Sequence, residues 1–114
     1  MEEVLFLVQG SDPEPYKVAF HRYSDGRLLA TCTCQAGQNG TYCKHRLAIL
    51  AGEISAIVSG NITDVHAIAN WLPGSPLRAC LDELSDAEKK MLAAQKLVSK
   101  IKKKLAATMY GRKA

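Results

Sequence analysis

The feature that most constrains this chain is a group of three cysteines and one histidine within fourteen residues. Cys32 and Cys34 are separated by one residue, as are Cys43 and His45, and eight residues lie between the two pairs. Three thiols and an imidazole are the ligand set of a closed, tetrahedral zinc site. The intervening segment 35–42 contains two glycines and an asparagine, which favour turns that return the second pair to the first. The spacing therefore predicts a Zn2+ site with these four residues as ligands.

The alternatives are a disulfide or separate buried thiols. Four cysteines among 114 residues are too few for a disulfide scaffold. No apolar stretch preceded by basic residues opens the sequence, so we expect a reducing compartment, cytoplasmic or, in a eukaryote, nuclear. Thiols in such a compartment bind metal more often than they form disulfides. We therefore expect zinc rather than a disulfide.

The pattern favours structural zinc over catalytic zinc. Catalytic sites keep an open coordination position beside a base, whereas four protein ligands close the shell here. No acidic residue lies between Cys32 and Arg46. His21 and His66 have no metal partner nearby in sequence, and Cys80 in an apolar segment is expected to be a buried hydrophobic residue. We therefore expect no catalytic residues and no enzyme activity.

The charge distribution is uneven along the chain. Fifteen basic and eleven acidic residues give a net charge of +4. Residues 85–114 hold nine basic and two acidic residues, or +7, which leaves 4 − 7 = −3 for residues 1–84. A basic C-terminal segment suggests an anionic partner, and no apolar run approaches the roughly 18 residues of a membrane span. We therefore expect nucleic acid, a protein partner, or both, and no membrane.

Hydrophobic periodicity predicts a small α+β fold. Residues 4–8, 16–23 and 28–34 have the pattern of three strands, and Asp25-Gly26 between the last two is a strong hairpin signal. Three strands with one apolar face need a covering element. The spacing of Leu47, Leu50 and Ile54 predicts a covering helix over 43–58. The expected fold is a three-stranded antiparallel sheet with a zinc site and a covering helix, followed by C-terminal helices.

Helical segments are predicted for the rest of the chain, at 63–72, 76–84 and 85–109. The last of these begins at Ser85, where Ser-Asp-Ala-Glu is a capping box. Apolar residues then recur with a seven-residue period that indicates a helix–helix seam over 84–108, as in a homodimer, or a helix packed on its own domain. The two positions of this repeat hold Leu84, Met91, Val98 and Leu105, and Ala87, Ala94, Ile101 and Thr108.

Three stretches around the ligands resemble the SWIM zinc finger, a family defined by C-x-C, a variable gap and C-x-H. They begin at Tyr16 (Tyr-Lys-Val-Ala-Phe), Thr31 (Thr-Cys-Thr-Cys-Gln) and Tyr42 (Tyr-Cys-Lys-His-Arg-Leu-Ala). The resemblance covers about residues 4–58 and implies strands before the ligands and a helix after them. It also implies DNA binding or protein contacts. The finger would stand nearly alone in a small protein, with residues 1–60 as the zinc-binding domain and 61–114 as a helical extension.

The sequence thus predicts a structural-zinc binding module whose target is nucleic acid, DNA in particular, with a protein–protein adaptor as the alternative. Lys44 and Arg46 flank the last ligand at a helix start, where phosphate is favoured. Polar residues of the loop could reach bases or sugars, and lysines of the last helix could contact phosphates. The candidate contact residues are Lys44, Arg46, Gln35, Gln38, Asn39, Lys100, Lys103 and Lys104.

Overall fold

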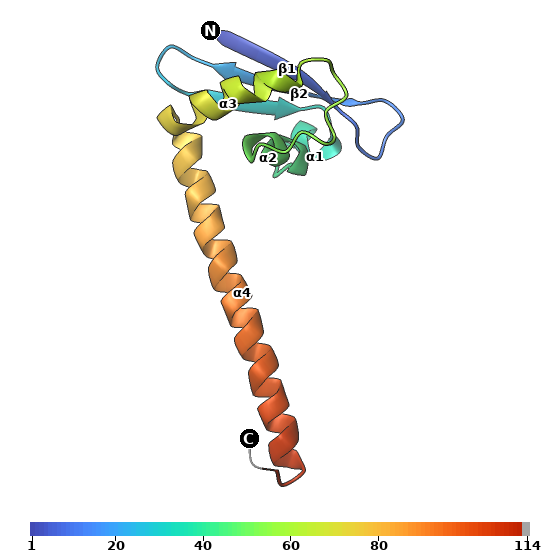
Figure 1. Cartoon of the computed structure of the whole chain (residues 1–114), viewed down its shortest axis with the longest axis vertical. Coiled ribbons are helices and arrows are strands. Elements are labelled where there is room, and N and C mark those ends of the chain that lie inside the picture. The colour runs from blue at the N-terminus through green and yellow to red at the C-terminus, as the bar shows by residue number, and fades with distance from the viewer. Residues whose placement is uncertain (113–114) are drawn as a thin grey trace. The chain divides into compact units, whose positions relative to one another are not determined.

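The computed structural model describes residues 1–112; it is shown in Figure 1. Contacts divide the chain into two compact units, Met1–Arg78 and Ala79–Ala114. The first unit holds the sheet and the zinc ligands, and the second contains most of one long helix. Lys113, counted above in the basic segment, lies outside the described residues. The domain boundary predicted after residue 60 stays a prediction, because compactness alone does not show which segment folds independently.

The predicted antiparallel meander is confirmed (Figure 1). Strands β1 (Glu2–Val8), β2 (Tyr16–Arg22) and β3 (Leu28–Cys32) lie in the order β1-β2-β3. The turn between β2 and β3 closes through a hydrogen bond from the Tyr23 N–H to the Arg27 carbonyl, 2.9 Å. Gly26 adopts a φ of 89°, a left-handed conformation that an Asp-Gly pair accommodates. The hairpin signal in the sequence therefore reflects a real backbone requirement.

One face of the sheet forms the core. Its central side chains are Phe6, Val18 and Phe20, which are fully buried, and the two rings meet edge to face with centroids 6.1 Å apart. Edge-to-face packing is a favoured arrangement of aromatic pairs. Ile49 and Ile68, from the helices that follow the sheet in sequence, are buried as well. The sheet thus places Cys32, at the end of β3, at the margin of this core.

The predicted covering helix at 43–58 is too long. Helix α2 spans Lys44–Leu50. Two residues later Gly52 has a φ of 85°, which stops the helix from continuing. The N–H groups of Gly52 and Glu53 bond the carbonyls of Ile49 and Ala48, a Schellman termination. The glycine was visible in the sequence, but the apolar residues beyond it had suggested a continuing helix.

Residues 56–58 instead extend along the outer edge of β1. Gln9 donates its N–H to the Ala56 carbonyl at 2.8 Å, and Val58 donates to the Leu7 carbonyl at 2.8 Å. An isolated bridge joins Val8 to Ile57, which is buried. Ile57 is therefore apolar because it packs beside a strand, and its helical spacing from Leu50 is coincidental.

The C-terminal half is helical, as predicted, with one correction. Helix α3 spans Val65–Trp71, flanked by 3₁₀ turns at Ile62–Asp64 and Leu72–Gly74. Helix α4 then runs without interruption from Pro76 to Met109, 34 residues. The capping box at Ser85 does not begin a new helix, because Ser-Asp-Ala-Glu fits a helix interior as well as a helix start. No helix within residues 1–112 has the length and apolar character of a membrane span.

The apolar repeat of α4 is exposed. Met91, Val98, Ile101 and Leu105 are 51–57% exposed. We call the stripe at the two repeat positions between Leu84 and Leu105 the α4 seam. Cys80, one heptad before Ala87, is also exposed, so the prediction that it is buried was wrong. An apolar segment does not bury a side chain when the neighbouring helix faces lack a partner.

Candidate metal centre

The four predicted ligands come from the ends of three elements. Cys32 is the last residue of β3, and Cys34 immediately precedes the one-turn helix α1 (Gln35–Gln38). Cys43 precedes α2, and His45 lies in its first turn. The segment 35–42, predicted as a turn-prone loop that returns the second ligand pair to the first, contains a helical turn that reverses the chain. This turn brings the second ligand pair beside the first.

The ligand atoms of Cys32, Cys34, Cys43 and His45 all lie within 4.8 Å of one another. The Cys34 and Cys43 sulfurs are 3.4 Å apart, and His45 Nδ1 lies 3.8 Å from the Cys32 sulfur and 3.6 Å from that of Cys43. Tetrahedral zinc with ordinary bond lengths separates two sulfurs by about 3.8 Å and sulfur from nitrogen by about 3.6 Å. The donor set and its spacing therefore fit Zn2+, with His45 ligating through Nδ1.

The three thiols are free and buried, and no disulfide joins them. The sulfur separation of 3.4 Å between Cys34 and Cys43 far exceeds the roughly 2.05 Å of a disulfide bond. The geometry of the three thiols therefore favours a metal site over a disulfide.

Backbone N–H groups donate hydrogen bonds to two of the ligand sulfurs. Cys34 caps α1, since its sulfur accepts the Gly37 N–H at 3.3 Å, and the Cys32 sulfur accepts the Cys34 N–H at 3.5 Å. Burial raises the pKa of Cys32. Burial acts on Cys43 in the same direction, but the Arg46 backbone N–H and the neighbouring side chains outweigh it and lower its pKa. Zinc binding requires deprotonated thiolates, so the site releases protons as it takes up the metal.

Two residues support the site without being ligands, and the ligand pattern did not single them out. The Tyr16 ring packs against the His45 imidazole with centroids 4.9 Å apart, which fixes the ring orientation. A Cβ at Gly37 would lie 2.2 Å from the Cys32 carbonyl oxygen. Gly37 is therefore required by the close approach of α1 to the end of β3. Its signal in the sequence was only a glycine between two ligand pairs.

The family model of the SWIM zinc finger matches residues 6–51. This range begins within β1, includes all four ligands and ends just after α2. Residues 6–51 form a SWIM zinc finger domain. The resemblance predicted over residues 4–58 is confirmed for this range, and the Cys3His site of the SWIM domain is a Zn2+ site. No curated protein and no solved structure matches the chain.

Several candidate contact residues of the SWIM domain are hydrogen-bonded within it. Gln38 donates to the Thr33 carbonyl at 2.7 Å, and Gln35 donates to the Asn39 side chain at 3.1 Å. Arg46 donates to the Ala30 carbonyl at 3.1 Å and to the Thr41 carbonyl. Lys44 is exposed. The loop amides and Arg46 thus hold the finger together. Among the described residues, Lys44 makes no side-chain hydrogen bond or ion pair within the domain.

We expect Arg46→Ala to destabilise the SWIM domain by about 1–3 kcal/mol without changing its zinc content. The reason is that the Ala30 and Thr41 carbonyls lose a charged donor that ties β3 to the loop before α2. Urea unfolding with metal analysis measures both quantities. Lys44→Ala is the matched control and should lie within about 0.5 kcal/mol of wild type. Equal unfolding midpoints for the two variants would contradict the bracing role of Arg46.

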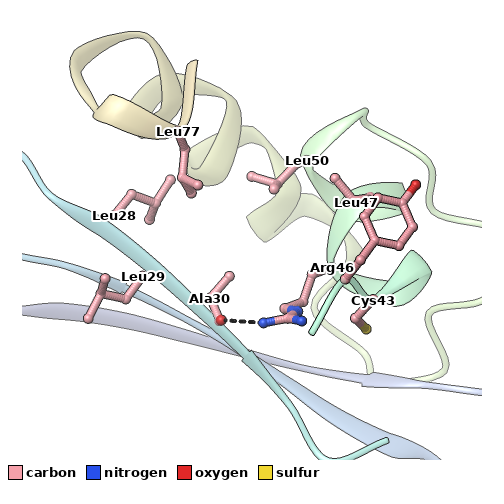
Figure 2. Close-up of a pocket in the computed structure, with 9 residues that line it drawn as sticks. Leu28, Leu29, Ala30, Cys43, Arg46, Leu47, Leu50 and Leu77 are labelled. Carbon is pink, nitrogen blue, oxygen red and sulfur yellow. Dashed lines mark hydrogen bonds between the residues drawn. The ribbon is translucent and has the colours of Figure 1, made fainter. Parts of the chain in front are cut away.

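An apolar groove lies beside Arg46, between β3 and α2 (Figure 2). It has a volume of about 330 Å³. Leu28 and Leu29 of β3, Leu47 and Leu50 of α2, and Leu77 at the start of α4 line it, and Leu28, Leu50 and Leu77 point toward one another (Figure 2). Tyr42, 70% exposed, stands at its margin. Every one of these residues belongs to the first unit, so the groove is a feature of one folded body.

Proposed function

We propose that this protein is a non-enzymatic nucleic-acid-binding protein in which α4 contacts phosphates and the SWIM domain is a separate folded unit. The observation that carries the proposal is a lysine face on α4. Four exposed lysines follow one another at helical spacing, namely Lys89, Lys96, Lys100 and Lys103. Steps of seven, four and three residues keep side chains on the same side of a helix.

The lysine face presents a row of positive charges, which attracts a phosphate backbone. Lys96, Lys100 and Lys103 line one shallow hollow together with Leu92, Gln95 and Ser99. Along the helix axis, the Cα atoms of Lys96 and Lys100 are about 6 Å apart, and those of Lys100 and Lys103 are about 4.5 Å apart. No ion pair of these lysines is found among residues 1–112. Unpaired ammonium groups in a row favour an anionic polymer over an isolated anion.

The first unit, which contains the SWIM domain, offers less to nucleic acid. Residues 1–78 contain six basic and seven acidic residues, so their charge is 6 − 7 = −1 before the zinc site is counted. Arg22 pairs with Glu2, Arg27 pairs with Asp25, and Arg46 braces the loop. With the loop amides also engaged, direct base reading by this surface is not favoured. We therefore propose binding that depends on phosphate and has little sequence preference.

Replacing Lys96 and Lys100 by glutamine is expected to flatten the salt dependence of duplex DNA binding. Each lost phosphate contact removes roughly 0.9 units from the slope of log K against log salt, so the pair should remove about two. The matched control is Lys90→Gln with Lys102→Gln, which removes the same charge from other sides of α4. Fluorescence anisotropy against duplex, single-stranded and RNA probes from low to high salt measures the slopes.

The control should retain most of the wild-type slope. Equal losses in the two double variants would show that only net charge matters and would contradict a defined lysine face. A wild-type protein that binds none of the probes at low salt would overturn the nucleic-acid proposal.

The closed zinc shell supports the proposal that the protein is not an enzyme. Four protein ligands fill a tetrahedral site and leave no position for substrate or water. The burial of all three sulfurs points the same way, since the relative exposures of Cys32, Cys34 and Cys43 are 3–6%. The metal would then act on folding alone.

A protein-binding adaptor is the second candidate, and the apolar groove favours it. A hollow lined by leucines, with an exposed tyrosine at its margin, has the composition of a protein contact. Under this alternative Tyr42→Ser weakens partner binding and the lysine-face variants do not. The groove alone does not indicate which protein would bind, whereas the lysine face indicates a polyanion. We therefore favour nucleic acid as the partner.

A further inference from the structure

The α4 seam lacks a partner. Its large side chains, Met91, Val98, Ile101 and Leu105, are each more than half exposed, and every residue from 85 to 106 is exposed. Most helical stability in proteins comes from packing an apolar face rather than from the propensity of the residues. We propose that the occupant of this face is the α4 seam of a second copy of the chain, lying antiparallel to the first.

The charges of α4 favour a second copy in the antiparallel direction. All four acidic residues from Ala79 onward lie at 82–88, and seven of the eight lysines lie at 89–104. Two parallel helices would place acid beside acid and lysine beside lysine, which is destabilising. An antiparallel pair places the acidic segment of each copy beside the basic segment of the other. Two copies of α4 are thus complementary in charge when they run in opposite directions.

The seam residues also fit in this direction. When Met91 lies opposite Ala94 of the second copy, Val98 lies opposite Ala87 and Leu105 opposite Cys80. In these three layers a large side chain meets a small one, and in the fourth layer Leu84 meets Ile101. The same register brings Glu83 beside Lys104 at the margin of the seam, twice in the symmetric pair. In a parallel pair Glu83 would face Glu88, which is a like-charge contact.

Pairing through the seam leaves the lysine face free. Lys100 lies nine residues after Met91, which at about 100° per residue is half a turn away. The seam and the lysine face are therefore on opposite sides of α4. Self-association does not depend on the proposed nucleic-acid binding, and either property can fail in an experiment while the other holds.

The first test is the mass of the zinc-loaded protein in solution. Sedimentation equilibrium is expected to give twice the 12.4 kDa of one chain. Val98→Asp, in the seam, should give the monomer mass. Ser99→Asp adds the same charge one residue later, outside the seam, and should stay dimeric. A monomeric wild type, or equal behaviour of the two variants, would overturn the proposal, and circular dichroism of both shows whether α4 remains helical.

The second test determines the direction of the helices through the exposed Cys80. An antiparallel pair places Cys80 opposite position 105 of the other copy, so Leu105→Cys should form a covalent dimer under mild oxidation. A bond within one chain is excluded, because 25 residues of helix span about 37 Å. The same substitution combined with Cys80→Ser should not cross-link. Covalent dimers of the wild type through two Cys80 residues, absent in Cys80→Ser, would show parallel helices and contradict the antiparallel arrangement.

Discussion

Removal of zinc with a chelator is expected to unfold the sheet and α2 while α4 stays helical. Apparent binding free energies of structural zinc in finger peptides are about 10–16 kcal/mol, as large as the whole stability of a typical domain, about 5–15 kcal/mol. The SWIM domain spans only residues 6–51, and so small a unit rarely folds on its hydrophobic core alone. The metal also joins the end of β3 to the starts of α1 and α2.

Circular dichroism and thiol alkylation measure the two parts of this result. Before chelation the thiols of Cys32, Cys34 and Cys43 should resist alkylation, because they are buried ligands. After chelation all three should react, and the helical signal of the 34-residue α4 should persist. Adding zinc back should restore protection of three thiols.

A matched pair of cysteine variants distinguishes the effect of losing the metal from the effect of losing a thiol. Cys43→Ser is expected to lose the zinc equivalent and to unfold the domain, whereas Cys80→Ser keeps both. Native protease resistance of Cys43→Ser throughout residues 6–51 would show that the domain does not depend on its metal.

Gly37→Ala is the second substitution with a large expected effect, and it changes no ligand. The added Cβ would lie 2.2 Å from the Cys32 carbonyl oxygen and 2.8 Å from its carbonyl carbon, which are backbone atoms of β3. Relief of this overlap moves α1 away from Cys32 and disturbs the Gly37 N–H bond to the Cys34 sulfur. Overpacking of this kind costs about 1–3 kcal/mol, occasionally more. We expect lower stability together with weaker zinc affinity.

Gly60→Ala is the control for this glycine. A Cβ at Gly60 meets nothing within 4 Å, and its φ is not positive. The substitution should leave zinc affinity unchanged and alter stability by less than about 1 kcal/mol. Competition with a chromophoric chelator gives the affinities. If Gly37→Ala binds zinc as tightly as Gly60→Ala, the close approach of α1 to β3 is not needed to form the site.

The ligands and the sheet could be predicted because their signals are local. Spacing alone defines the Cys3His set, and the Asp25-Gly26 turn fixes how β2 and β3 pair. The length of the covering helix could not be predicted from periodicity, since Ile57 is apolar for a contact with Val8, which lies far away in sequence. Tertiary pairing produced a helical spacing by coincidence.

The contact residues show a further limit of sequence reasoning. Arg46 beside a zinc ligand has the composition of a phosphate contact, yet its guanidinium bonds the Ala30 carbonyl, sixteen residues earlier. Whether a polar side chain is free depends on which carbonyls the fold leaves near it. For α4, by contrast, the lysine positions follow from helical geometry, and their exposure agrees with the pattern.

The two edges of the sheet have a consequence for how this protein behaves at high concentration. Unpaired strand edges are templates for growth by neighbouring molecules, and natural sheets protect them. Here residues 56–58 cover the edge of β1, and the Arg46 side chain occupies the Ala30 carbonyl on the edge of β3. Edge-to-edge polymerisation of the sheet is thereby disfavoured. Assembly of this chain is left to the surfaces outside the sheet, where charge and shape can make it selective.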